Sequence, residues 1–388
     1  MITLHYRQAD AEKQNIKTHR SEIFCILINT FGLSFPQILF FSNFYFSFVS
    51  KHFIIKVVVL YDLDPRWDKP EISNARDSNK VLVESLKEEG IETYLEELKD
   101  PDLEMILKKY NPDDTIIFNL CESLPGIPYS ERRVLEIIKN KGFTYTGNIP
   151  DVIELSCDKQ KVKEVLVSLG VSVPYGAVLT PEEAAGWKLF PAIVKPSRDH
   201  CSLTLTEKSV VYDISSLQKQ ILLVNNELNQ PALVEDFIDG REFHVSVWNN
   251  EPPEILPPVE MDFSAFSEAR KRLCTYDSKF NPGSEHYEKI GTLVPAPLDQ
   301  KLFKKLKKEV LTTWKGFGCL DYARFDFRLR DDKFYLLDIN PNNDISIDAS
   351  FALAAGMANY SYGQIVKRIV MMAAERHPVF GEKVLISV

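Results

Sequence analysis

The hydrophobic pattern in the first half of the chain predicts a sheet whose strands alternate with helices. The run Lys56-Val-Val-Val-Leu-Tyr61 is almost continuously apolar, as in a parallel-sheet strand buried on both faces. A helix pattern with Val81, Leu82 and Leu86 on one face follows and ends at Gly90. We expect further strands at 91–95, 115–120 and 143–146, and helices at 102–110 and 131–140. This alternation predicts an α/β fold that begins with an open, doubly wound domain.

The pattern changes after Gly147 and predicts a second, smaller domain. We expect Ser156 to cap a helix with apolar residues at 162, 165, 166 and 169, and Thr180 to Glu183 to form the capping box of another helix. Strands at 191–195, 203–206, 232–237 and 242–247 are expected to form a mostly antiparallel sheet. From residue 251 the chain returns to longer strands, a Lys-rich helix at 302–314, and a final hairpin and helix.

The segment before the first strand differs from the rest. Between Ile23 and Ser50 it has no charged residue and holds eight of the 24 Phe of the chain. A membrane or surface anchor, a packed element, and a dispensable extension from a start site set too far upstream all stay open. We favour the extension, because polar residues and Pro36 interrupt the run. The expected domains are therefore an extension (1–54), a doubly wound domain (55–153), a small subdomain (154–243) and a C-terminal subdomain (244–388).

Composition limits the class of protein. With 388 residues, of which 45% are hydrophobic and 26% charged, the chain has the make-up of a globular protein of several domains. A net charge of −9 argues against a nucleic-acid partner, because phosphate neutralisation needs a basic face. The six cysteines are scattered, with no metal-binding spacing. Reduced thiols and a cytoplasmic location are expected, and membrane attachment is not.

The strongest chemical signal comes from two predicted strands near the C-terminus, at 322–328 and 335–340. Because side chains alternate along a strand, Arg324 and Asp326 share one face, and Asp338 and Asn340 likewise share one face. If an odd-length loop centred on Asp332 joins the strands, Asp326 lies opposite Asp338. Facing carboxylates repel unless a cation separates them, and hard oxygen ligands favour Mg²⁺ or Mn²⁺. A register slip by one residue would instead leave an ordinary solvated hairpin.

Two further segments are ambiguous alone. Lys195 ends an apolar strand, where most lysines are simply solvated, and the stretch from Glu235 to Glu242 reads as strand, glycine turn and strand. In this order, however, these segments and the hairpin resemble the ATP-grasp superfamily, most closely the D-alanine–D-alanine ligase family, over residues 56–376. The matching motifs are Phe118-Asn-Leu-Cys-Glu122, Tyr145-Thr-Gly147 with Asp158-Lys159, Phe190-Pro-Ala-Ile-Val-Lys195-Pro196, Val234-Glu235-Asp-Phe-Ile-Asp-Gly240-Arg-Glu242, Tyr276-Asp-Ser-Lys279-Phe280 and Arg324…Asp326…Asp338-Ile-Asn340.

The resemblance implies an ATP-grasp fold, in which two α+β subdomains clasp ATP, and an ADP-forming ligation of a carboxylate to an amine through an acyl phosphate. It also implies small amino-acid or carboxylate substrates and a homodimer. The residue roles that it implies are phosphate binding by Lys159 and Lys195, adenine binding by the backbone of Glu235, Asp236, Phe237 and Ile238, ribose binding by Glu242, Mg²⁺ binding by Asp326, Asp338 and Asn340, and catalysis by Arg324, Lys279 and Ser202.

The chain departs from the family pattern in four places. The loop at 198–204 has no glycine, Asn342-Asn343-Asp344 replaces a Pro-Gly, Asp338 stands where Glu is more common, and Asp62-Leu-Asp-Pro-Arg-Trp67 replaces the Gly/Ser/Glu segment that holds the first D-alanine. Three functions stay open. They are a dipeptide ligase of the D-alanine–D-alanine type, an ATP-grasp ligase for another substrate, and a catalytically weak ATP-binding regulator.

Overall fold

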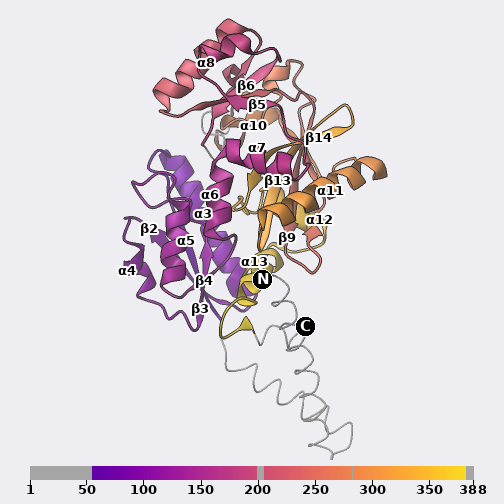
Figure 1. Cartoon of the computed structure of the whole chain (residues 1–388). Coiled ribbons are helices and arrows are strands. Elements are labelled where there is room, and N and C mark those ends of the chain that lie inside the picture. The colour runs from indigo at the N-terminus through magenta and orange to yellow at the C-terminus, as the bar shows by residue number, and fades with distance from the viewer. Residues whose placement is uncertain (1–54, 199–204, 282, 382–388) are drawn as a thin grey trace, which may run out of the picture. The chain divides into compact units, whose positions relative to one another are not determined.

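The computed structural model describes residues 55–198, 205–281 and 283–381 (Figure 1). The extension expected at 1–54 lies outside the described residues. The described part contains three sheets with helices packed around them. Within these ranges, no helix combines the length and the hydrophobicity that crossing a bilayer requires.

The first sheet is parallel, with the strand order β2-β1-β3-β4. Its strands are β1 (Lys56–Asp62), β2 (Glu92–Leu98), β3 (Thr115–Asn119) and β4 (Thr144–Tyr145). Its connecting helices are α3 (Lys69–Glu88), α4 (Leu103–Leu107) and α5 (Glu131–Asn140). This order is that of a doubly wound domain, so the predicted α/β class is confirmed.

Strand β1 is buried on both faces, as its apolar run predicts. Val57 and Val59 pack in one core with α3 and with the C-terminal helix α13 (Tyr362–Ala374). The intervening Val58 and Leu60 pack in a second core with α4 and α5. In Figure 1, α13 is the yellow helix beside the first strands. The last described long helix of the chain therefore covers one face of its first sheet.

The second sheet is antiparallel, in the order β5-β8-β6-β7, and all its strands lie in the segment expected to form the small subdomain. Its strands are β5 (Gly176–Val178), β6 (Ala192–Pro196), β7 (Val210–Val211) and β8 (Ala232–Asp236). Helix α8 (Ile214–Glu227) packs on it through Leu217, Ile221 and Val224. Helices α6 (Pro150–Cys157) and α7 (Lys159–Ser168) precede this sheet.

Local structure differs from several sequence predictions. Asp158, not Ser156, caps α7, because Ser156 lies inside α6, which the hydrophobic pattern did not separate. Thr180 and Glu183 do exchange the two capping-box hydrogen bonds, but only a short 3-10 helix, η1 (Glu183–Gly186), follows. The strand expected at 203–206 falls partly on undescribed residues. Its described part is not a strand, and β7 lies further along the chain. Val81 is exposed, and Val83 takes its expected place in the core.

The third sheet is the largest and has the strand order β12-β11-β9-β13-β14, with β10 paired to β9. Its strands are β9 (Arg241–Trp248), β10 (Glu254–Ile255), β11 (Val259–Asp262), β12 (Gly291–Leu293), β13 (Tyr322–Arg330) and β14 (Lys333–Asn340). The remaining elements are η2 (Glu207–Ser209), η3 (Ala269–Lys271), α9 (Asp277–Phe280), α10 (Glu285–Lys289), α11 (Gln300–Phe317) and α12 (Ser350–Met357). The expected placement of 242–247 in the small sheet is wrong, since β9 pairs with β11 and β13.

The β13–β14 hairpin reaches the predicted register by an unpredicted route. Its turn has two residues, Asp331 and Asp332, both with positive φ (52° and 56°), rather than an odd-length loop. A β-bulge then inserts one extra residue, Leu337, into β14 and shifts the register, so that Asp326 pairs with Asp338. Leu337 and Asp338 consequently both line one cavity, although an unbroken strand would place them on opposite faces.

Candidate active site

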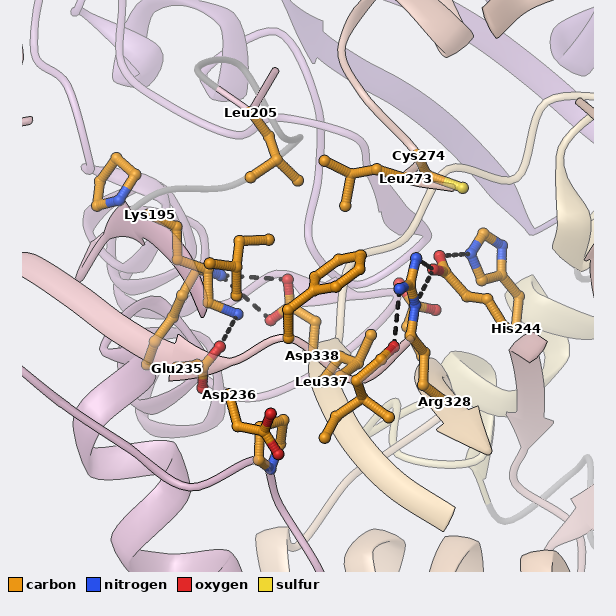
Figure 2. Close-up of a pocket in the computed structure, with 18 residues that line it drawn as sticks. Lys195, Leu205, Glu235, Asp236, His244, Leu273, Cys274, Arg328, Leu337 and Asp338 are labelled. Atoms are coloured by element: carbon orange, nitrogen blue, oxygen red, sulfur yellow. Dashed lines mark hydrogen bonds and ion pairs between the residues drawn. The ribbon is translucent and has the colours of Figure 1, made fainter. Parts of the chain in front are cut away.

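One cavity is lined by β6 and β8 of the small sheet and by β9, β13 and β14 of the large sheet. It has about 900 Å³ of empty space, including the part open to solvent, and Figure 2 shows the side chains that line it. Of the thirteen predicted site residues, nine lie on its wall: Lys159, Lys195, Glu235, Asp236, Phe237, Ile238, Glu242, Asp326 and Asp338. Segments far apart in the sequence therefore converge on one site.

The other four predicted residues are not on the cavity wall or lie outside the described part of the structure. Arg324 and Asn340 do not line the cavity, but both contact Asp326, which does. The backbone of Lys279 lies in the short helix α9, and its side chain is outside the described part of the structure. Ser202 lies outside the described residues altogether.

Glu235 bridges two lysines at the small-sheet side of the cavity. Its carboxylate oxygens lie 2.5 Å from the Nζ atoms of Lys163 and of Lys195. Burial alone would raise the pKa of Glu235, but the two ammonium groups outweigh it and bring the pKa to about 2. One carboxylate thus holds two positive charges, leaving a net positive group that suits a phosphate.

Lys163 was not among the predicted residues, although a signal for it existed. It follows Lys159 by four positions in α7, and this spacing places two residues on one face of a helix. Lys159 points to the other side of the cavity, where its Nζ lies 3.2 Å from an oxygen of Asp338.

The two acids of the hairpin lie on one face and both have cationic partners. Arg324 donates two hydrogen bonds to Asp326, with donor–acceptor distances of 2.8 and 3.0 Å. Asn340 donates to the same carboxylate at 3.0 Å. Asp338, the cross-strand neighbour of Asp326, is paired with Lys159. Two carboxylates and an amide are the hard oxygen donors that Mg²⁺ takes, so the residues present fit that ion.

Glu242 lies at the far end of the cavity with a partner that sequence reasoning missed. It is almost fully buried, and Nε of Arg328 donates to its Oε2 at 2.8 Å (Figure 2). Burial opposes ionisation, but Arg328 and His244 lower the pKa of Glu242 to about 2. Ligand atoms of Glu242, His244 and Cys274 lie within 4.8 Å of one another, as in some metal sites. The guanidinium of Arg328, however, already compensates the charge of this carboxylate.

The segment after β1 differs from that of the family in sequence, and the structure shows what its first acid does. Asp62 accepts hydrogen bonds from the backbone N–H of Glu122 at 2.9 Å and from the hydroxyl of Ser123 at 2.8 Å. Burial raises the pKa of Asp62. Asp62 thus holds the loop after β3 in place. In a separate contact, the hydroxyl of Tyr276 reaches Glu71 at the start of α3.

Comparison with known proteins identifies the family to which the chain belongs. The family model described as "D-ala D-ala ligase C-terminus" matches residues 178–371. The chain belongs to the D-alanine–D-alanine ligase family. It is 27% identical to the D-alanine–D-alanine ligase of Aquifex aeolicus over 324 residues, which cover 81% of this chain and all of that protein. It is 31% identical to the uncharacterized protein y4sG of Sinorhizobium fredii over 312 residues, 78% of this chain and 89% of that protein.

A solved structure supports the same conclusion about the fold. The D-alanine–D-alanine ligase of Bacillus anthracis, in complex with ATP, superposes with a TM-score of 0.63 at 19% identity, covering 83% of this chain and 98% of that one. The predicted ATP-grasp fold is confirmed. The predicted class of a D-alanine–D-alanine ligase-like, ATP-dependent ligase is confirmed at the level of the family.

Proposed function

We propose that the chain uses ATP and a divalent cation to activate a small carboxylate substrate and join it to an amine. The observation that carries this proposal is the convergence on one cavity of buried lysines, a facing pair of acids and a buried acid with its own arginine. Phosphoryl transfer needs mainly positioning and electrostatic stabilisation, and these groups can supply both.

The two ends of the cavity suit different parts of the nucleotide. We call Lys159, Lys195, Asp326 and Asp338 the phosphate end, because ammonium groups and metal-binding carboxylates meet there. We call Phe237, Ile238, Glu242 and Arg328 the nucleoside end, where the backbone after β8 offers hydrogen-bonding groups to adenine and Glu242 offers an acceptor to the ribose hydroxyls.

Asp326, Asp338 and Asn340 would hold Mg²⁺ at the phosphate end. When bound, the ion would neutralise charge on the phosphate oxygens. Lys159 would then exchange Asp338 for a phosphate oxygen, since a partly exposed pair at 3.2 Å costs little to separate.

In the proposed reaction a carboxylate oxygen of the substrate attacks the γ-phosphorus of ATP, and ADP leaves. The amine then attacks the acyl carbon, phosphate departs, and the amine loses a proton. Arg324, whose guanidinium stays charged beside Asp326, is proposed to stabilise the negative charge that develops on the acyl group. Lys279 at the transferred phosphate and Ser202 in the loop over the phosphates stay predictions. The cytoplasmic location and the homodimer also stay predictions.

A ligase for a carboxylate other than D-alanine is the second candidate. It is favoured by the segment after β1, where Asp62 is occupied by the backbone of Glu122 and the hydroxyl of Ser123. The two candidates share the nucleotide site and differ only in the amino-acid site.

The test is an ADP-release screen with the full chain, Mg²⁺ and a panel of D- and L-amino acids. Release of ADP that depends on D-alanine alone supports the first candidate, and release with another amino acid supports the second. Tight ATP binding without turnover on any carboxylate would contradict both and favour a regulatory protein.

A further inference from the structure

Arg328 is among the largest fully buried side chains of the described part, with 2% of its surface exposed. It lies in β13 and lines the cavity. Its guanidinium donates to Oε2 of Glu242 and to the carbonyl of Ile238, each at 2.8 Å, and to the carbonyl of Arg272. A guanidinium buried without acceptors costs several kcal/mol, so this position depends on all three contacts.

The three acceptors belong to three separate segments. Ile238 follows β8, Glu242 lies in β9, and Arg272 follows η3. The rings of Phe237 and Phe263 lie 4.9 and 5.6 Å from the guanidinium carbon. A planar group with donors on several edges can hold such segments in fixed relative positions, which a lysine ammonium cannot do.

The contacts leave one oxygen of Glu242 directed elsewhere. Both Nε and Nη2 of Arg328 reach Oε2, at 2.8 Å each. The other oxygen, Oε1, lies 3.5 Å from Nε2 of His244, whose Nδ1 is 2.9 Å from the hydroxyl of Ser350. Arg328 thus sets the rotation of the carboxylate, and Oε1, which faces His244, is the oxygen that Arg328 does not bind.

We propose that Arg328 is a positioning residue that aims Glu242 and the Ile238 segment at the nucleoside of ATP and thereby sets the preference for ribose over deoxyribose. This inference rests on the proposed function, since it concerns the same nucleotide site. Arg328 itself does not touch the reacting atoms. It acts through the orientation of Glu242.

The experiment measures the Kd of ATP, 2′-deoxy-ATP and 3′-deoxy-ATP by calorimetry on the full chain and on Arg328→Met. Loss of one charged hydrogen-bond network predicts ATP binding weaker by about 10- to 100-fold. The ratio of deoxy-ATP Kd to ATP Kd is expected to fall toward one. Saturating ATP should restore most of kcat, which separates positioning of the nucleoside from a role in chemistry.

Two further variants make the result specific. Glu242→Gln alone should lose the same preference for ribose, and adding Arg328→Met to it should lower that ratio no further, because both changes act on one carboxylate. Arg241→Met is the matched control. Arg241 precedes Glu242 in β9, pairs with Glu260 at 2.6 Å and does not line the cavity. The ratio of deoxy-ATP Kd to ATP Kd in Arg241→Met should therefore match that of the wild type.

A wild-type ribose preference in a folded Arg328→Met overturns the inference. If Arg328→Met does not fold, Arg328→Lys decides, because it keeps the charge but cannot span three acceptors. If Arg328→Lys keeps the wild-type ratio of deoxy-ATP Kd to ATP Kd, the inference is overturned. If the ratio falls toward one, the inference is supported. Failure of the wild type itself to bind ATP would overturn the proposed function instead, so the two failures are distinguishable.

Discussion

The two ends of the cavity hold their charges in different ways. At the nucleoside end, Glu242 and Arg328 form a pair whose side chains are 7% and 2% exposed, and backbone carbonyls fix the arginine further. At the phosphate end, Asp338 and Lys159 are 35% and 11% exposed and 3.2 Å apart. The contacts at the nucleoside end are therefore fixed by the protein, whereas in the proposed reaction Lys159 and Asp338 at the phosphate end are expected to exchange partners. The proposed site thus combines a fixed half, Glu242 with Arg328, and an exchangeable half, Asp338 with Lys159.

Replacing Asp338 is expected to give the largest effect. Asp338→Ala removes one of two facing carboxylates, and we expect kcat to fall by roughly 10³-fold or more with little change in Tm. Steady-state ADP release and thermal melts would measure both. Asp332→Ala, in the exposed turn of the same hairpin, is the control. Full turnover in Asp338→Ala would remove the metal assignment and with it the exchangeable half.

Glu235, next to the phosphate end, is not expected to exchange partners, because it is buried between Lys163 and Lys195. Glu235→Gln leaves both lysines without a counter-charge and is expected to cost about 3 kcal/mol of unfolding free energy. The Tm should then fall by roughly 4 °C, because the entropy of unfolding grows with chain length. Glu260→Gln, whose partner Arg241 lies at the surface, should cost much less.

The same variant has a defined pH dependence. The folded pKa of Glu235, about 2, lies below its ordinary value of 4.5, so its stabilising contribution is complete above pH 4.5 and is lost as the pH falls toward 2. The difference in stability between wild type and Glu235→Gln should therefore be constant from pH 8 to 5 and shrink on further acidification. A difference that grows in acid would contradict the assigned pair.

Lys159 tests whether the partly exposed pair does exchange. Lys159→Met should raise the KM for ATP by about 10- to 100-fold, because a charged contact to phosphate is lost, while Tm changes little. Initial rates over a range of ATP concentrations would measure this. A large loss of stability with an unchanged KM would show that the Asp338–Lys159 pair is structural.

The smallest expected effect comes from salt. Raising ionic strength from 0.05 to 0.5 M should weaken ATP binding several-fold, since phosphate contacts are screened, but should change adenosine binding less than about twofold. Calorimetric Kd values for both ligands test this. If the Kd values of ATP and adenosine depend equally on salt, the proposed division into a phosphate end and a nucleoside end is contradicted.

The sequence predicted which residues meet at the cavity better than it predicted the backbone features that bring them together. The pairing of Asp326 with Asp338 was predicted from an odd-length loop, yet a two-residue turn and the bulge at Leu337 produce it. Bulges leave little trace in the alternation of residues. Arg328 was readable as a side chain on the same face as Asp326, but its acceptor Glu242 lies 86 positions away. Contacts between residues so far apart in the sequence are visible only in the structure.

For secondary structure, too, local features were predicted well and long-range pairing was not. Strand β1 and helix α5 were predicted closely, because their signals are local. The sheet to which β9 belongs was wrong, since a half-buried strand fits either neighbour by pattern alone.

The packing of α13 on α3 and β3 has a consequence for synthesis of the chain. Residues Val57, Val59 and Ile116 are translated well before Ile365, Val366 and Ile369, which supply part of their cover. Until α13 is made, only α3 of these two helices can cover this face of the first sheet, so part of its apolar surface stays exposed. Chaperone demand and sensitivity to premature stop codons should both concentrate in that interval.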